Sequence, residues 1–599
     1  MSDTAAAERS VNLFVLSIIA VLVGVVTGFG AVFFRALIAL VHNVFFLGRF
    51  SFVYDANIYT PPSPWGALVI LVPVIGGLAV VFLVRTFAPE ARGHGVPEVM
   101  DAIFYKEGRI RPVVAAVKSL ASALSIGSGS AVGREGPIIQ IGASLGSSIG
   151  QVIRLEAWQR ITLVAAGAGA GIAATFNTPI GGVIFAIELM MPEVSTRTFL
   201  PVALATGTAT FVGRIFFGPR PAFDVPALGS LSVHPSAIYV LALYAMLGVV
   251  AGVAAAAFIR GLHLAEDRFD RIKNPYLRHA IGMSLVGAMM YAFFRFSGHY
   301  RIEGVGYSTI QDVLLGGLTA APFLALLSAA KLVATSVSLG SGSSGGIFSP
   351  SLFMGATLGG AFGALSHLLF PSADISVPAF AMVGMAAMVG GGTGAAMTAV
   401  TMIFEMTLDY GIVMPMIIAV AISIGCRRVL SRENIYTIKL LARRHFIPKA
   451  LHANMFLVRR AVDVMDKDIL VLPHTMPFDD FLRLPEHEGR MRHVVITRDE
   501  KISGVLRVNT ALRRGLEGAY TGLSLGDVAS PDFTIARGED IMFNVIGRMW
   551  RRKAIMAVVV EADERIPRTK NVAGLITKEH VADSVAESIR PYAASDAIL

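Results

Sequence analysis

The chain has 599 residues, of which 54% are hydrophobic and 16% are charged. A soluble globular domain carries about 25% charged residues, so the composition disfavours a soluble protein and excludes collagen-like and disordered classes. Cys426 is the single cysteine, which allows no intrachain disulfide and no cysteine-based metal cluster. The net charge of +9 fits positively charged flanks of membrane spans better than nucleic-acid binding.

Charged residues are distributed unevenly along the chain. They make up about 11% of residues 1–445 and about 28% of residues 446–599. The contrast predicts a polytopic α-helical membrane domain over 1–445 and a soluble domain over 446–599.

Apolar runs mark the expected membrane segments. The long runs cover residues 11–34, 65–84, 161–187, 236–259 and 378–404. Shorter or glycine-broken segments cover residues 112–133, 198–212, 280–294, 309–330, 351–370 and 411–426. The first run is too long for a signal-peptide core, so we expect it to be a retained helix. The shorter segments predict tilted, broken or re-entrant helices buried within protein.

The membrane domain contains an internal repeat. Residues 127–137 (GSGSAVGREGP) resemble residues 340–350 (GSGSSGGIFSP) at an offset of 213, and the run ending at Glu188 resembles the run ending at Glu405 at an offset of 217. Two halves with glycine-broken helices at corresponding places are typical of transporters with inverted repeats. Chance similarity in a chain with 60 glycines is the alternative.

The glycine and serine breaks indicate an anion site. A helix that begins inside the membrane directs free N–H groups and the positive end of its dipole into a cavity. Such an end binds anions without a full counter-charge. Residues 93–98 (GHGVPE) offer a third start of this kind. The three starts together predict an anion site near mid-membrane.

These motifs resemble those of the CLC chloride channel and chloride/proton antiporter family. Residues 93–97, 133–137 and 346–350 stand in the order and separation of the three anion-site motifs of that family, and Tyr436 matches its late tyrosine. Lys118 stands where the family often has a lysine. The resemblance implies transport of chloride and similar anions in a lipid bilayer, voltage gating, and a homodimer with one pathway per subunit. It also implies inverted halves at about 1–225 and 226–445.

The resemblance assigns the candidate site residues. The anion-binding set is His94, Gly95, Val96, Arg134, Glu135, Gly136, Ile347, Phe348 and Tyr436. His94 replaces the usual serine of the family. Either its imidazole donates an N–H to the anion, or only the backbone N–H groups of Gly95 and Val96 bind. Tyr436 is interpreted as an anion ligand, with an interfacial aromatic anchor as the alternative. Ile347 and Phe348 would contribute backbone N–H groups.

Glu135 is the candidate gate. A carboxylate within a membrane segment is costly and is a functional candidate by default. By resemblance it occupies an anion site when ionised and leaves that site when protonated. A surface pair of Arg134 and Glu135 is the alternative.

Glu188 and Leu189 bear on proton coupling. In antiporters of the family two consecutive acids stand here, and the second transfers protons on the inner side. Leu189 cannot carry a proton, although some antiporters manage without this acid. Glu188 and Glu405 are interpreted as structural buried acids, with a substitute proton path through Glu188 as the alternative. The sequence therefore favours a passive or proton-uncoupled chloride channel over an antiporter.

The tail resembles a tandem pair of CBS modules, at about 460–515 and 523–590, which implies an α/β fold. Strand entries are expected at 462–465 and 525–528. Such pairs often bind adenine nucleotides, but the acidic ribose-binding residue that often follows the last strand is not evident: Asn509 and His580 stand there. A purely dimerising tail is the alternative.

Arg427, Arg428, Arg443 and Arg444 predict a cytoplasmic tail on a multi-pass protein of the cell (inner) membrane.

An enzymatic function is disfavoured. An intramembrane hydrolase would need a motif such as HExxH, and His487-Glu488 lacks the second histidine. The sequence has no phosphate-binding loop, which leaves ATP-driven pumping unsupported. No metal site is predicted.

Overall fold

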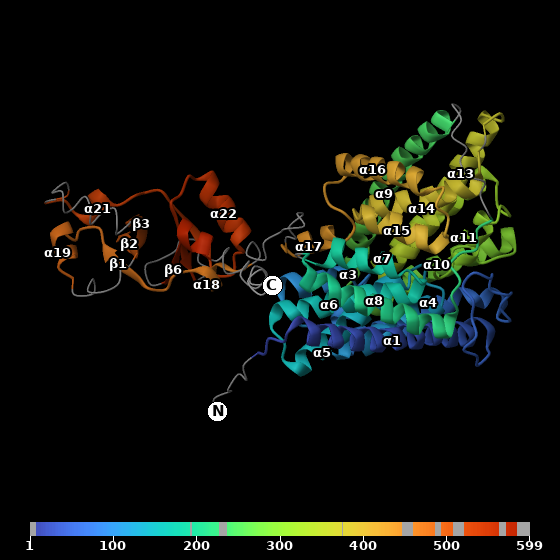
Figure 1. Cartoon of the computed structure of the whole chain (residues 1–599), viewed down its shortest axis with the longest axis horizontal. Helices are drawn as coiled ribbons and strands as arrows, with labels where there is room; N and C mark the ends of the chain where they lie inside the picture. Colours follow the sequence, from blue (N-terminus) through green and yellow to red (C-terminus); the bar gives the residue numbers. More distant parts are fainter. Residues whose placement is uncertain are drawn as a thin grey trace. The chain divides into compact units, whose positions relative to one another are not determined.

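The computed structural model describes residues 8–191, 194–226, 237–373, 375–445, 459–484, 493–506, 520, 522–561 and 571–583. The chain forms two compact units, Met1–Phe446 and Ile447–Leu599 (Figure 1). The residues 507 and 509, on which part of the nucleotide-site prediction depended, lie outside the described residues.

The first unit is built of helices. Its first half contains α1 (Leu13–Leu47), η1 (Gly66–Leu71), α2 (Val72–Phe87), η2 (Pro89–Ala91), α3 (Val96–Tyr105), α4 (Val113–Gly127), α5 (Glu135–Ile153), α6 (Ala157–Phe176), α7 (Pro179–Phe185), η3 (Ala186–Met190) and α8 (Thr196–Phe217). Its second half contains α9 (Ala237–Asp270), α10 (Pro275–Ser297), α11 (Tyr307–Leu314), α12 (Ala321–Ser341), α13 (Phe348–Leu369), α14 (Val377–Thr393), α15 (Ala396–Thr407), α16 (Val413–Leu430) and α17 (Thr437–Ala442).

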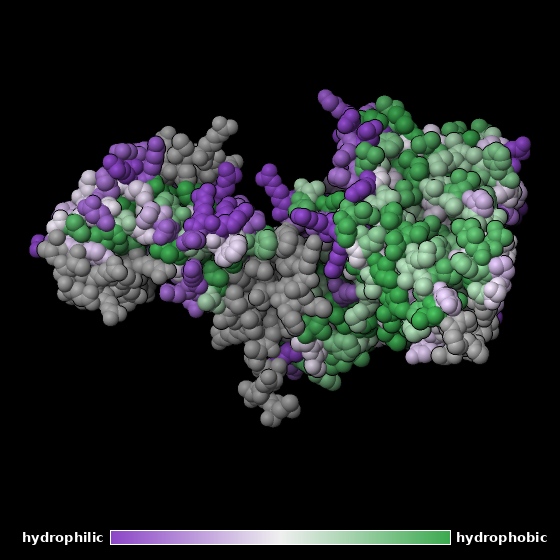
Figure 2. Space-filling view, turned by 90° about the horizontal axis from the view of Figure 1, so that it is seen from above, coloured by the Kyte–Doolittle hydropathy of each residue, from purple (hydrophilic) through white to green (hydrophobic). Residues whose placement is uncertain are grey.

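Within the described residues, eight helical segments are long and apolar enough to cross a membrane. They include α1 and α9, the longest helices of the unit. Hydrophobic side chains cover much of the outer surface of this unit, where an ordinary soluble protein would present charge (Figure 2). The unit is therefore a multi-span membrane domain.

Two of the predicted spans are wrong as single helices. The run 161–187 is divided between α6 and α7, and the run 378–404 between α14 and α15. Asn177 ends α6 with a left-handed φ of 62°, and Gly394 ends α14 with a φ of 76°. Hydropathy cannot detect such breaks, because it measures apolar content, which stays the same where the backbone changes direction. The segment 309–330 likewise spans parts of α11 and α12.

Glycines let the corresponding helices of the two halves pack closely. A Cβ on Gly142 of α5 would collide with the carbonyl of Gly167 in α6, and one on Gly355 of α13 would collide with the carbonyl of Gly384 in α14. Small residues permit such close backbone approach in membrane helices. The pairs α5–α6 and α13–α14 thus repeat one packing arrangement at the repeat offset.

One of the arginines predicted to flank the last spans has a different role. Arg427 is buried, and its Nε donates to the carbonyl of Gly391 at 2.9 Å. It therefore stabilises the C-terminal end of α14, where carbonyls lack helical partners. Arg443 forms an ion pair with Glu98 of α3 at 2.6 Å.

The second unit contains two small α/β modules of the same topology. The first has α18 (Ala461–Val464), β1 (Ile469–Pro473), α19 (Phe478–Leu482), β2 (His493–Arg498) and β3 (Lys501–Leu506). The second has α21 (Leu525–Val528), β4 (Phe533–Arg537), α22 (Met542–Arg551), β5 (Met556–Val560) and β6 (Val572–Thr577).

In each module the first pair of strands is parallel and the second antiparallel, in the orders β1-β2-β3 and β4-β5-β6. Val495 and Val505 of the first sheet share a buried cluster with Val558 and Leu575 of the second. The modules therefore have a common core. The strand entries predicted at 462–465 and 525–528 are wrong: these segments are the single helical turns α18 and α21. For α21, Ser524 and Asp527 form a capping box, which favours helix over strand.

Candidate anion site

The three glycine motifs meet in the interior of the membrane domain. Gly133 donates to the carbonyl of Gly346 at 2.7 Å, and Gly346 donates to the carbonyl of Gly133 at 2.6 Å. Gly345 donates to the carbonyl of Gly93 at 3.3 Å. Segments more than 200 residues apart are thereby joined at the points where α3, α5 and α13 begin.

Two glycines are required for this approach. Gly95, the residue before α3, has a φ of 84°, a conformation that side chains disfavour. A Cβ on Gly136 would collide with the carbonyl of His94. The N-terminal ends of α3 and α5 can therefore lie close together only with glycine at both positions.

The Glu135 carboxylate lies at the beginning of α13. It accepts hydrogen bonds from the Ser349 backbone N–H at 3.1 Å, from the Ser349 hydroxyl and from the Tyr307 hydroxyl. The side chain is fully buried. A negative oxygen thus occupies the position that a helix N-terminus offers to an anion. This argues against a surface pair of Arg134 and Glu135.

Tyr307 was missed by the sequence analysis. It is the first residue of α11, and it follows Gly304-Val305-Gly306, which mirrors Gly93-His94-Gly95 before α3. The repeat thus supplies a fourth glycine-led helix start. The spacing of the two GxG segments, 211 residues, was the signal that could have revealed it.

Arg134 lines a separate cavity. This cavity has a volume of about 210 Å³, and Tyr307 also lines it. The guanidinium of Arg134 lies 5.0 Å from the Tyr307 ring centre and 5.6 Å from that of Phe176. The remaining charged lining residues are Arg35, Asp55, Arg214, Arg220 and Asp224. The lining thus has four arginines against two aspartates, so this cavity carries a net positive charge beside Tyr307.

His94 and Tyr436 lie beside each other in the interior of the membrane domain. Both side chains are buried, and their ring centres are 5.9 Å apart. The Nδ1 atom of His94 has no hydrogen-bond partner among the described residues. Because an unpaired buried polar atom is costly, this nitrogen is available to a ligand. Val96, Ile347 and Phe348 are buried at the starts of α3 and α13.

A second, larger cavity of about 910 Å³ reaches the Gly93 motif. Lys439 and Arg443 from the region of α17 line it, together with Arg92. The acidic lining residues are Glu90, Glu98, Glu266 and Asp270, against six lysines and arginines. The cavity therefore carries a net positive charge next to the predicted anion ligands, which favours the entry of anions.

Two buried lysines brace the glycine segments. Lys118 donates to the carbonyls of Ala91 and Gly93, at 2.9 and 2.7 Å. Lys331 donates to the carbonyls of Ile302 and Gly304 at the same distances. The two lysines are 213 residues apart, which is the repeat offset. Lys118 was noted from sequence, whereas Lys331 was missed although the offset predicts it.

Glu188 and Glu405 each cap a helix in the opposite half of the membrane domain. Glu188 accepts from the backbone N–H groups of Met397 and Thr398, at 3.2 and 2.8 Å, at the start of α15. Glu405 accepts from the N–H groups of Ile180 and Gly181, at 3.0 and 2.6 Å, at the start of α7. Each carboxylate satisfies N–H groups that lack helical partners. These contacts support the interpretation of both acids as structural.

A helix cap and a proton relay respond differently to mutation. We expect Glu188→Ala to lower stability by about 1 kcal/mol, the usual cost of losing a cap, whereas Glu188→Gln keeps an accepting oxygen and costs less. Thermal unfolding of the purified protein in detergent measures both. Glu405→Ala and Glu405→Gln are the matched controls and should behave alike. A Glu188→Gln protein that keeps its stability but loses all pH dependence of transport would identify Glu188 as a relay.

Comparison with known proteins assigns the family. The family described as "Voltage gated chloride channel" matches residues 76–428. The chain belongs to this family. The membership confirms the CLC resemblance, and it makes this chain a transport protein and not an enzyme.

Two relatives indicate which kinds of family member the chain resembles. The chain is 34% identical over 365 residues to "Putative chloride channel protein ClcB-like" of Ralstonia nicotianae, covering 59% of this chain and 81% of the relative. It is 33% identical over 420 residues to "H(+)/Cl(-) exchange transporter ClcA" of Salmonella agona, covering 69% and 85%. One relative is thus described as a channel and the other as an exchanger.

Solved structures confirm the fold class. A slow cyanobacterial Cl⁻/H⁺ antiporter matches with a TM-score of 0.62 and 26% identity, covering 72% of this chain and 97% of that one. A eukaryotic CLC transporter matches with a TM-score of 0.58 and 20% identity, covering 95% and 98%. The second match extends over the tail as well. The protein is a helical multi-span CLC protein with a C-terminal α/β region that resembles CBS domains.

Proposed function

We propose that this CLC protein conducts chloride and similar anions passively, through a pathway that Glu135 gates. The anion would bind where α3, α5 and α13 begin, with His94 and Tyr436 as side-chain ligands. Gly95, Val96, Gly136, Ile347 and Phe348 would bind it through the backbone. Arg134 would act from the arginine-lined cavity by attracting anions towards the gate.

The proposal that chloride transport is uncoupled from protons rests on Leu189 and on the contacts of Glu188. Leu189 offers no titratable group, and the Glu188 carboxylate is held by two backbone N–H groups and the Thr398 hydroxyl at the start of α15. These contacts occupy the carboxylate as a helix cap, which supports a structural role for Glu188 and not a role as a proton relay.

Proton-coupled exchange is the second candidate function. The description of the Salmonella relative as an exchanger favours it. Measuring the reversal potential of the purified protein in liposomes, under opposed chloride and proton gradients, distinguishes the two. A passive pathway reverses at the chloride equilibrium potential, whereas an exchanger reverses at a potential that depends on both gradients.

We further propose a homodimer with one pathway per subunit, in the cell (inner) membrane, with the tail in the cytoplasm. The support is membership of the family together with the soluble composition of residues 446–599. Protease treatment of right-side-out and inside-out vesicles tests the topology: the tail should be cleaved only in inside-out vesicles. Chemical cross-linking in the membrane tests the dimer.

His94 should tune anion preference. An imidazole is wider than a serine hydroxyl, and the buried Nδ1 of His94 has no hydrogen-bond partner among the described residues. We expect His94→Ser to change the nitrate-to-chloride permeability ratio. Flux assays with each anion measure this. An unchanged ratio would mean that the backbone alone coordinates the anion.

A further inference from the structure

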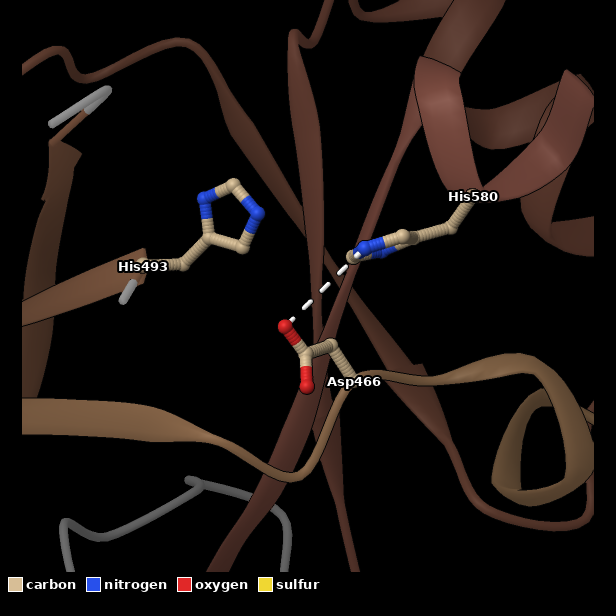
Figure 3. A group of neighbouring side chains, drawn as sticks. All are labelled: Asp466, His493 and His580. Carbon is tan, nitrogen blue, oxygen red and sulfur yellow. Dashed lines mark ion pairs between the residues drawn. The ribbon is translucent and has the colours of Figure 1, made fainter. Parts of the chain in front are cut away.

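The second unit contains a cluster of three side chains with metal-binding chemistry. Asp466, His493 and His580 each offer one ligand atom, and these atoms all lie within 4.8 Å of one another. The Asp466 carboxylate and the two imidazole rings border one space (Figure 3). We propose that these three residues bind a divalent transition metal ion of the zinc class, which joins the two modules of the tail.

The donor set fits this class of ion. Two imidazole nitrogens and one carboxylate oxygen are a common zinc ligand set, with the fourth position left to water. Neutral imidazole suits zinc and its first-row neighbours, whereas magnesium and calcium prefer oxygen ligands alone. Ligands of a tetrahedral zinc ion lie about 3.4 Å apart, given bonds of ~2.0–2.1 Å. The three side chains would therefore move closer by a small rotation on binding.

The backbone around the cluster is fixed by strand pairing. Asp466 exchanges two backbone hydrogen bonds with Leu575 of β6, both at 2.9 Å. His493 is the first residue of β2. The backbone N–H of His580 donates to the Thr577 hydroxyl at 3.2 Å, directly after β6. Rigid elements thus hold the three residues near one point, which lowers the entropy cost of assembling a site.

The side chains of two of the three ligands are partly exposed to solution. The side chains of His580 and Asp466 are 24% and 31% exposed, and His580 Nε2 lies 3.9 Å from an Asp466 carboxylate oxygen. One rearrangement is needed. The Thr577 backbone N–H donates to His580 Nδ1 at 3.3 Å. A neutral imidazole that binds a metal through Nε2 carries its proton on Nδ1, so this long hydrogen bond must be released. A metal ion that binds its ligand directly can readily displace so weak a hydrogen bond.

Sequence spacing does not reveal this site. The ligands are 27 and 87 residues apart, so they match no short metal-binding motif. They meet only because β6 of the second module pairs with the segment that precedes β1 of the first. Since His493 belongs to the first module and His580 to the second, a bound ion would also stabilise the contact between the modules.

Cobalt binding to the full-length protein tests the proposal. After removal of metals with a chelator, we expect Co²⁺ to give ligand-field absorption with a stoichiometry of one per subunit, and Zn²⁺ to displace it. His493→Gln and His580→Gln should each weaken binding by at least ~10-fold. His474→Gln, a tail histidine outside the cluster, is the matched control and should bind as the wild type does. Equal binding by all three variants, or no absorption by the wild type, would overturn the proposal.

A second measurement uses the wild-type chain, so it does not depend on whether the variants fold. Diethyl pyrocarbonate modifies accessible histidines, and peptide mapping locates the modified positions. Zn²⁺ should protect His493 and His580 from modification but leave the modification of His474 unchanged. Equal modification of His493 and His580 with and without Zn²⁺ would contradict the proposal whatever the variants do.

Discussion

Glu135→Gln should hold the anion pathway open and remove the activation of transport by low external pH. Charge on the carboxylate strengthens its hydrogen bonds and its interaction with the start of α13, and the glutamine lacks this charge. Its amide group would also place an N–H donor against the Ser349 N–H or hydroxyl. Loss of about 2 kcal/mol of gate binding corresponds to a ~30-fold shift towards the released side chain.

Chloride efflux from liposomes at several external pH values measures this effect. The wild type should transport faster as external pH falls, because protonation removes the charge that competes with the anion. Glu135→Gln should be fast at every pH. Glu405→Gln is the matched control, since Glu405 also binds backbone N–H groups at a helix start but lies at α7. A Glu135→Gln protein with wild-type rate and pH dependence would exclude Glu135 as the gate.

Chloride flux through the wild type should drive no uphill movement of protons. A proton needs titratable groups to cross the domain, and Leu189 interrupts such a chain on the side of Glu188. Placing a charge in an apolar membrane interior costs about 3 kcal/mol, which corresponds to ~100-fold slower transfer. Proton uptake recorded with a pH electrode, during chloride efflux from liposomes, tests this expectation.

Leu189→Glu provides the complementary variant, and Leu189→Gln its uncharged control of similar shape. We expect Leu189→Glu alone to gain measurable proton movement coupled to chloride. Stoichiometric uphill proton transport by the wild type would refute the uncoupled function and identify the chain as an exchanger with a different proton route.

Sequence patterns alone predicted the membrane domain, the charge-rich tail, the repeat and the family motifs. These depend on local composition and on glycine and proline at fixed spacings, which act within a few residues of chain. The same patterns predicted Glu135 and Tyr436 as residues of the candidate site. Hydropathy could not divide the run 161–187 at Asn177, because a left-handed residue changes backbone direction without changing apolar content.

Only the tertiary structure decided which distant groups meet. The bonds from Tyr307 and Ser349 to Glu135, and the exchange of caps between Glu188 and Glu405, join residues more than 170 positions apart. The Asp466, His493 and His580 cluster likewise forms across two modules. Such contacts follow from the packing of complete helices and sheets. A buried polar atom must find a partner in three dimensions, and its own sequence neighbourhood does not specify which one.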